Sequence, residues 1–546
     1  MFSKIRNNKL LNTIYKNHFK ISSVLVILFI ISMFLFLYKN FYLLVDSDMS
    51  SELVLAKQLA SERKIITSNW YYSTELRVLN TQLVFTPLFM IFDNWNIVRT
   101  LGTFILVIVL LLSFWYFSKG FNIKYRSYLS FLIVGSISLS YYSFVIMGAY
   151  YIPHIAISFF TLGLISRIMD NTSKKNIVRI IVLFVLSFLA GMGGLRQLLI
   201  LYIPLCITSV IFLIYEQRKN LMIPKIEIKS KSFKLNIVSF STILFATIGY
   251  MINSKILSKF IKFKDFEKIH FTKFSFGKFE NLINGVISSF GYKSDDLVFS
   301  KSALSLNIMA IVLIMIVSFS LIYIIKNYRK IASKHFFITV FYIIAILTMS
   351  LIILFTDAWY YDRYLLPITI FFVPVIGVLL SNMHIKFYKI SIIIFLVGYA
   401  FIGSWYYLIY TKNNNYKYKE FFDRRESTIS TKSEDVINIK NVLLENEAFN
   451  GYSSYWTANI LTELSDGKID VWCFEGNSII NDIFEWLQLT SHRNEIPSGK
   501  VFVILNKDEA EKVKFREYDK LNILYKDKNR VVYLFNSQEE LVSSLE

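Results

Sequence analysis

The 546-residue sequence is poor in cysteine and in charged residues. Its two cysteines, Cys206 and Cys473, are expected at different levels of the molecule, so no disulfide framework is indicated. If part of the chain is exported, the lack of a disulfide framework is more typical of a bacterial protein. The last 136 residues contain no glycine-rich phosphate loop, no His/Cys set with metal-ligand spacing and no internal repeat, which argues against a nucleotide-binding or zinc-binding tail.

Apolar residues dominate instead. They make up 54% of the chain and the mean hydropathy is +0.47, so an ordinary soluble enzyme is excluded. A spanning helix needs about 20 mostly apolar residues. The sequence predicts eleven such helices, over residues 21–45, 96–117, 127–147, 152–168, 177–193, 197–215, 235–252, 305–326, 336–355, 364–381 and 388–410. Because no small-residue cleavage site follows the first helix, it is interpreted as a retained anchor and not a signal peptide.

The distribution of basic residues predicts how the chain is oriented. The connections after spans 2, 4, 6, 8 and 10 are basic, as is the N-terminus, and basic loops stay in the cytoplasm. We therefore expect a cytoplasmic N-terminus in the plasma membrane, with the C-terminus outside. The outer connections would then hold Asp46, Asp48, the Tyr150–Tyr151 turn, the Gly191–Arg196 turn and the Asp357–Arg363 segment.

The net charge of +20 belongs to the membrane part. Residues 1–410 hold 41 Lys and Arg against 16 Asp and Glu, whereas residues 411–546 hold 18 against 23. Anionic headgroups and lipid phosphates are the partners within reach of that basic excess. Nucleic acid is not an expected partner.

Two outer loops of the predicted membrane domain, residues 1–410, are long enough to fold. The loop 46–95 should begin with an amphipathic helix, since Leu53, Ala56, Leu59 and Ala60 recur at helical spacing, and this helix would lie along the membrane surface. The loop 253–304 interleaves lysine with phenylalanine. It is either an interfacial segment that contacts lipid headgroups or a solvated loop with a buried aromatic face.

The segment 411–546 is predicted to be a small extracytoplasmic α/β domain. Residues 434–446 and 458–464 have helical patterns, and residues 469–474, 501–505 and 531–535 are short runs rich in Val, Ile and Phe. Such a domain could cover a site on the membrane part or bind an acceptor.

Acidic residues at the edge of a bilayer are costly and usually mark chemistry. Asp46 and Asp48 follow the first span, and either could be a catalytic base. Asp48 precedes the amphipathic helix and could also be its N-cap, a duty we do not expect of Asp46. Glu75 and Arg77 in the same loop are candidate substrate-binding residues or a surface ion pair.

Two arginines are expected on the outer side. Arg196 follows a glycine-rich turn, and Arg363 lies in an aromatic segment beside Tyr361. A guanidinium can bind a lipid phosphate with two prongs, although Arg363 could also pair with Asp357 or Asp362, or anchor the chain at the interface. His154 opens the fourth span and is either a substrate-binding residue or a helix-start histidine satisfied by a neighbour.

The chain resembles the GT-C integral-membrane glycosyltransferases, and most of all the branch with bacterial protein O-mannosyltransferases and the aminoarabinose transferase that acts on lipid A. The resemblance covers roughly residues 20–410. It consists of an acidic motif after the first span (Asp46-Ser47-Asp48), an amphipathic loop helix, the Arg363-Tyr364-Leu365-Leu366-Pro367 run and a C-terminal outer domain. It implies that Asp46 or Asp48 is the catalytic base, although the usual Asp-Glu motif is replaced here by Asp-Ser.

We therefore expect a polytopic α-helical glycosyltransferase that moves a sugar from a polyprenyl-phosphate donor to a cell-envelope glycopolymer, glycolipid or protein. The donor phosphate would bind Arg363 and Arg196, and a divalent cation is possible. The alternatives are a polymerase or ligase of lipid-linked oligosaccharides, which would rely more on arginines, a lipid or sugar transporter, or a non-catalytic scaffold. Transport is disfavoured because few charges lie within the spans.

Overall fold

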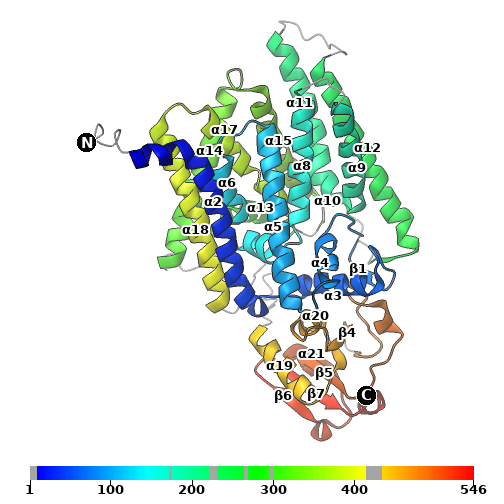
Figure 1. Cartoon of the computed structure of the whole chain (residues 1–546). Coiled ribbons are helices and arrows are strands. Elements are labelled where there is room, and N and C mark those ends of the chain that lie inside the picture. Colours follow the sequence, from blue (N-terminus) through cyan, green and yellow to red (C-terminus); the bar gives the residue numbers. More distant parts are fainter. Residues whose placement is uncertain are drawn as a thin grey trace.

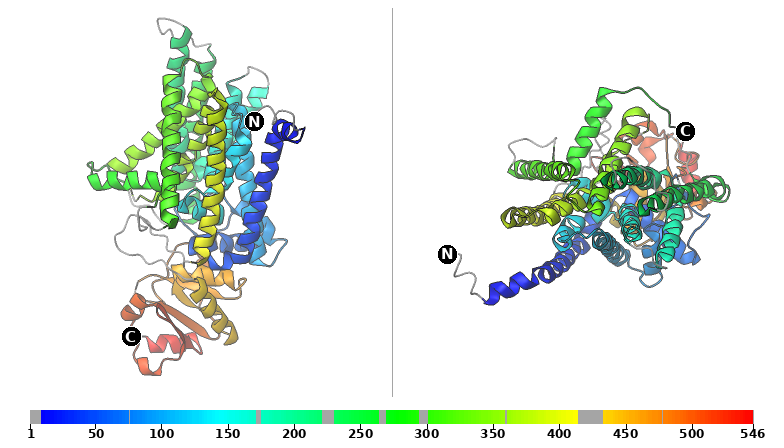
Figure 2. Two further views of the ribbon diagram at one scale, coloured as in Figure 1. Left: turned by 90° about the vertical axis from the view of Figure 1, so that its left-hand side faces the viewer. Right: turned by 90° about the horizontal axis from the view of Figure 1, so that it is seen from above.

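A computed structural model describes residues 9–74, 76–170, 175–220, 230–263, 269–293, 301–358, 360–413, 433–476 and 478–545. The chain forms a bundle of long helices with a smaller mixed domain at one end (Figures 1 and 2). The N-terminal end of helix α2 lies at the opposite end of the bundle from that domain.

The bundle is built from apolar helices. Eight helical segments of the described residues are long and apolar enough to cross a membrane, or nine if one bent pair counts as a single span. The bundle contains these segments together with shorter helices. Its helices are α2 (Lys9–Asn40), α5 (Trp95–Gly120), α6 (Arg126–Val134), α7 (Leu139–Tyr141), α8 (Ile152–Ile168), α9 (Lys175–Met192), α10 (Leu195–Gln197), α11 (Ile203–Asn220), α12 (Lys231–Lys255), α14 (Lys301–Lys326), α15 (Ser333–Phe355), α16 (Leu366–Thr369), α17 (Phe372–Asn382) and α18 (Lys386–Asn413). The chain is therefore a polytopic helical membrane protein.

Three of the eleven predicted spans differ from the others. The fourth and fifth correspond to apolar helices of 17 residues, Ile152–Ile168 and Asn176–Met192, which are short for a bilayer. The third, 127–147, is bent by 82° between Val134 and Leu139. Gly135 and Ser138 interrupt the helix there, because Ser138 accepts a hydrogen bond from the backbone N–H of Tyr141 and so begins a new helix.

Charged loops of the predicted inner side meet at the end of the bundle away from the smaller domain. Lys334 binds Asp170 at 2.6 Å and the carbonyl of Gly120 at 2.8 Å, which joins three predicted cytoplasmic loops. Lys389 lies 5.6 Å from the ring of Tyr125. Loops that were predicted to be cytoplasmic thus lie together at one end of the bundle. Which end faces the cytoplasm stays a prediction.

Helix α3 (Ser47–Glu62) is the predicted amphipathic helix, and it crosses the lower ends of the spans (Figure 1). Leu53, Ala56 and Leu59 are buried as predicted, and Ala60 is half-buried. The helix contacts α4 (Gln82–Phe89) on one side and the smaller domain on another. It is therefore held between protein surfaces and does not lie freely on the membrane.

The described part of the basic and aromatic loop contains helix α13 (Phe276–Ser289), and strand β2 (Lys262–Phe263) pairs with β1 (Tyr71–Tyr72) of the first loop. Phe260, Phe271, Phe274 and Phe276 are exposed, Phe271 by 92%. Phe263, by contrast, packs against Tyr72. The described part of this loop therefore has both exposed and packed rings, and the choice between the two interpretations stays open.

The C-terminal segment forms the predicted α/β domain. Its five-stranded sheet has the order β4-β3-β5-β7-β6. Strands β4, β3 and β5 are parallel to one another, β7 is antiparallel to β5, and β6 is antiparallel to β7. The elements are α19 (Ser433–Glu445), β3 (Asn450–Ser454), α20 (Tyr455–Leu464), β4 (Asp470–Phe474), β5 (Val501–Asn506), α21 (Lys507–Lys512), β6 (Ile523–Lys526), β7 (Arg530–Phe535) and α22 (Gln538–Ser544). Both cysteines are buried and free.

Candidate functional site

Asp46 and Asp48 both lie at the N-terminus of α3, but the residue that caps the helix is Asp46 and not Asp48. Asp46 is the N-cap, and its Oδ1 accepts a hydrogen bond of 2.8 Å from the backbone N–H of Met49. Asp48 lies in the first turn of the helix. The prediction that Asp48 caps the helix is therefore wrong. The reason is that Asp46 has extended backbone, φ −120° and ψ 173°, which is the conformation a capping residue needs.

Asp48 holds two groups from distant parts of the chain. The Tyr455 hydroxyl of α20 donates to its Oδ1 at 2.7 Å, and Nη1 of Arg363 lies 3.5 Å from its Oδ2. Of the other two partners predicted for Arg363, Asp357 accepts a hydrogen bond from the backbone of His270, and Asp362 accepts one from Ser288. The structure thus joins the acidic motif to the late arginine.

The electrostatics of the two carboxyls differ. Burial and the negative charge of Asp48 raise the pKa of Asp46 to about 7, against the opposing effects of the Met49 N–H, Arg99 and Arg363. Burial and Asp48 also raise the pKa of Tyr455 well above its usual range, so this hydroxyl stays a donor. The Asp46 carboxyl therefore exchanges a proton near neutral pH.

Arg196 belongs to a second group beside the first. It follows Gly194, whose φ of 89° is open to glycine and strained for other residues. Its Nη1 donates to Nε2 of His154 at 3.3 Å, and its guanidinium lies 5.2 Å from the ring of Tyr151 and 5.1 Å from that of Tyr364. Nε2 of His154 therefore has a hydrogen-bond partner in Arg196.

Aromatic rings connect the two arginines. The Arg363 guanidinium lies 4.7 Å from the ring of Tyr361 and 5.3 Å from that of Phe144. Tyr361 and Tyr364 pack edge to face with 5.5 Å between ring centroids, and the Arg196 guanidinium lies over the Tyr364 ring. Two guanidinium groups therefore lie on one aromatic strip, an arrangement that suits a doubly charged anion.

Tyr150 is a member of the site without a hydrogen-bond partner among the described residues. Its ring is buried, and its hydroxyl is unpaired. The ring packs against those of Phe144 and Tyr151, at 5.7 Å and 5.5 Å between centroids. Burial and the charges of Asp46 and Asp48 raise the pKa of Tyr150 well above its usual range. A buried donor of this kind is available to a substrate.

The C-terminal domain is fastened to the bundle beside the site. Arg99 of α5 forms a buried, two-pronged ion pair with Glu463 of α20, with 2.6 Å between Nη2 and Oε2, and it also donates to the carbonyl of Met49. Ser47 donates to the carbonyl of Tyr455. These contacts fix α20 on α3 and so position the Tyr455 hydroxyl on Asp48.

The structure therefore unites Asp46, Asp48, Arg363 and Tyr361, and places Arg196 and His154 beside them. Arg77 lines a small cavity together with His154. Glu75 lies outside the described residues. Sequence reasoning missed Tyr455 and Phe144, and for Tyr455 no local signal existed, because 407 residues separate it from Asp48.

Among the described residues, no group of three or more His, Cys, Asp or Glu side chains is arranged to hold a metal ion. The cation that Asp48 contacts is the Arg363 guanidinium. No protein-family model matches the chain, and no curated protein matches it either.

Proposed function

We propose that this protein is a membrane glycosyltransferase that takes a sugar from a polyprenyl-phosphate donor. The observation that carries the proposal is the geometry of the acidic motif: Asp46 caps α3 two residues before Asp48, whose carboxylate lies 3.5 Å from the Arg363 guanidinium on the aromatic strip. Burial and the charge of Asp48 raise the pKa of Asp46 to about 7. A general base is most effective when its pKa is near the working pH. An arginine next to that base can stabilise the charge of a departing phosphate.

In the proposed reaction, Asp46 removes the proton from an acceptor hydroxyl. The acceptor oxygen attacks the anomeric carbon, the bond from that carbon to the phosphate oxygen breaks, and polyprenyl phosphate leaves with the electron pair. Arg363 and Arg196 bind the leaving phosphate. This direct displacement inverts the configuration at the anomeric carbon.

Asp48 has a supporting part in the proposal. Both of its carboxyl oxygens have partners, Tyr455 and Arg363, whereas Asp46 has only the Met49 N–H as a hydrogen-bond donor among the described residues. A carboxylate engaged on both oxygens has less room to accept the proton of a substrate hydroxyl. We therefore assign proton removal to Asp46 and orientation of Arg363 to Asp48.

The proposed membrane arrangement has eleven spans, in which the bent pair and the two 17-residue helices complete the eight long helices. The site and the C-terminal domain would face outside. Because both native cysteines are buried, a cysteine introduced at exposed Lys520 should react with an impermeant maleimide in intact cells, and one at Lys330 should not. The opposite labelling pattern would contradict the orientation.

The direct test is transfer by the purified protein in lipid nanodiscs, with a panel of polyprenyl-phosphate sugars and envelope acceptors. The expected product has inverted configuration, and Asp46→Asn lowers the rate of its formation by roughly 10²–10⁴-fold. A polymerase or ligase of lipid-linked oligosaccharides, favoured by the pair of arginines on one aromatic strip, would instead consume oligosaccharide donors and depend more on Arg196 and Arg363 than on Asp46.

A further inference from the structure

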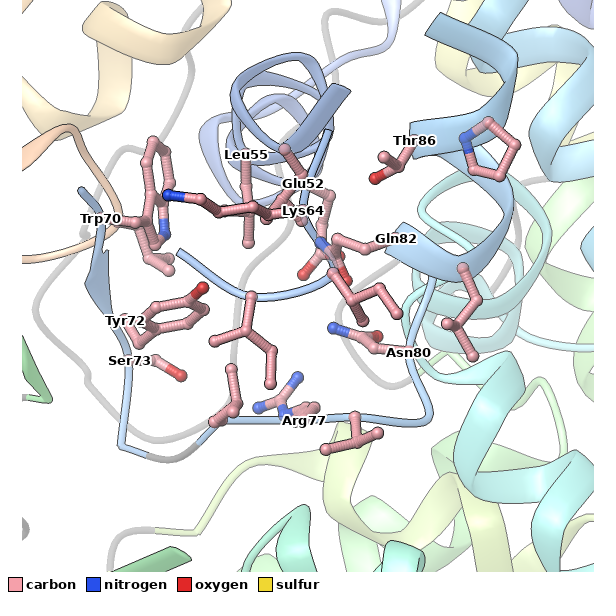
Figure 3. A pocket seen from close by; sticks show the side chains of 18 of the residues that line it. Glu52, Leu55, Lys64, Trp70, Tyr72, Ser73, Arg77, Asn80, Gln82 and Thr86 are labelled. Atoms are coloured by element: carbon pink, nitrogen blue, oxygen red, sulfur yellow. The ribbon is translucent and has the colours of Figure 1, made fainter. Parts of the chain in front are cut away.

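A pocket of about 220 Å³ lies between α3, α4 and the loop that joins them (Figure 3). Leu55 and Leu59 of α3 form one wall, and Thr86 and Pro87 of α4 form another. Trp70 and Thr86 project into the pocket from opposite sides in Figure 3. The pocket is separate from the aspartate pair, although Asp48 lies one helical turn before Glu52 of its lining.

Three polar groups of the lining have no hydrogen-bond partner within the described part of the chain. They are Nε1 of Trp70, Oγ1 of Thr86 and Oδ1 of Asn80. Trp70 is fully buried and Thr86 is 7% exposed, so neither group is well placed to be satisfied by bulk water. An unpaired buried donor or acceptor costs about 1–3 kcal/mol, and a ligand that pairs with it recovers that energy.

The charges of the lining favour an anion. Arg63, Lys64 and Arg77 are cationic, and Glu52 is the carboxylate among the lining residues. Lys64 also lies 3.2 Å from Glu62, which is outside the lining, so Arg63 and Arg77 supply most of the positive charge. The Gln82 side chain donates to Oε2 of Glu52 at 2.6 Å, which reduces the repulsion this carboxylate would exert on an anion. A ligand with phosphate oxygens would accept hydrogen bonds from the cations and from the Trp70 N–H.

The rim of the pocket is apolar. Ile65, Leu83 and Met90 line it and are 73%, 48% and 55% exposed. The volume is below the 300–1,000 Å³ or so of pockets that enclose a whole small ligand. The space therefore suits a polar headgroup, with hydrocarbon chains outside against the exposed apolar side chains.

We propose that this pocket binds the headgroup of an anionic phospholipid that carries free hydroxyls, as phosphatidylglycerol does. The phosphate is recognised by Trp70 and the basic side chains. A headgroup hydroxyl donates to Oδ1 of Asn80, and the Thr86 hydroxyl pairs with another headgroup oxygen. This site is independent of the proposed sugar transfer.

The test is native mass spectrometry of the purified full-length protein, titrated with phosphatidylglycerol, with phosphatidylcholine of the same chains, and with soluble glycerol phosphate. We expect phosphatidylglycerol to bind at least about tenfold more tightly than either of the other two. Thr86→Val and Trp70→Phe should each weaken its binding by about fivefold, the worth of one hydrogen bond. Leu83→Trp should block the rim and abolish binding.

Two controls are matched to these variants. Thr103 of α5 also has a buried unpaired hydroxyl but does not line the pocket, so Thr103→Val should leave lipid binding unchanged. Leu112 is exposed on the same helix, and Leu112→Trp adds equal bulk away from the pocket.

Unchanged phosphatidylglycerol binding in both Thr86→Val and Leu83→Trp, with native melting temperatures, would overturn the proposal. Equal binding of glycerol phosphate and the lipid would overturn its assignment to a lipid.

Discussion

Replacing Asp46 with asparagine separates its two duties, because asparagine caps a helix about as well as aspartate but is not a base. The hydrogen bond from the Met49 N–H to residue 46 should therefore persist. Turnover should nevertheless fall by roughly 10²–10⁴-fold, the usual worth of general-base catalysis. The assay is sugar transfer in nanodiscs at saturating donor and acceptor, with the folded fraction measured in parallel.

The pH dependence supplies a second measure of the same group. Because Asp46 must be ionised to accept a proton, wild-type turnover should rise with pH around an apparent pKa of about 7. Stability should change in the other direction. Folding raises this pKa from 3.8 to about 7, so the folded state binds the proton more tightly and loses stability as pH rises between those values.

Three pKa units correspond to at most about 4 kcal/mol. Asp46→Asn should remove this loss, so its melting temperature should fall less than that of the wild type between pH 5 and pH 8. Asp48→Asn is the comparison variant: it keeps the cap and the candidate base but removes the partner of Arg363 and a charge that raises the pKa of Asp46, so its loss should be smaller and its pH profile should shift to lower pH. Wild-type turnover in Asp46→Asn, or a larger loss in Asp48→Asn, would refute the assignment of the base.

Further variants test the surrounding groups. Arg363→Lys should weaken donor binding by about tenfold, because lysine keeps the charge but loses the two-pronged geometry, and an unchanged donor affinity would make Arg363 only an interfacial anchor. Glu463→Gln leaves the buried charge of Arg99 uncompensated and should lower stability by about 3–5 kcal/mol. The exposed Glu517→Gln should cost less than about 1 kcal/mol in the same unfolding assay. Tyr150→Phe removes an unpaired hydroxyl, so stability should hold while substrate affinity falls about fivefold, and unaltered affinity would remove Tyr150 from the site.

Apolar runs and helical periodicity in the sequence were sufficient to predict the long apolar helices, α3, α19, α20 and part of the sheet, but not α4, α13, α21 or α22. The strands over 469–474, 501–505 and 531–535 correspond to β4, β5 and β7. Strand β3, with the sequence Asn-Gly-Tyr-Ser-Ser, was missed because it lacks β-branched residues. Its Gly451 lies so close to Phe502 of β5 that a Cβ there would be 2.5 Å or less from the ring. Tertiary packing, and not β-propensity, makes this segment a strand.

The site was only partly predictable for a related reason. Asp46, Asp48, Arg196 and Arg363 stand out because charge near a bilayer is rare, and that signal is local. The choice of cap depended on the backbone angles of two neighbouring aspartates, which composition does not encode. The bend after Val134, which carries Phe144 and Tyr150 to the site, depends on contacts such as the hydrogen bond from the Ser136 N–H to Ser404.

The hydrogen bond between Tyr455 and Asp48 has a consequence for the biogenesis of the protein. A ribosome makes Asp48 first and must add 407 more residues before Tyr455 exists. The acidic motif therefore enters the membrane early, as an incomplete site. It acquires its last partner only after the C-terminal domain has reached the same side and folded. The site can therefore be complete only when synthesis, insertion and folding of the chain up to this domain have all taken place.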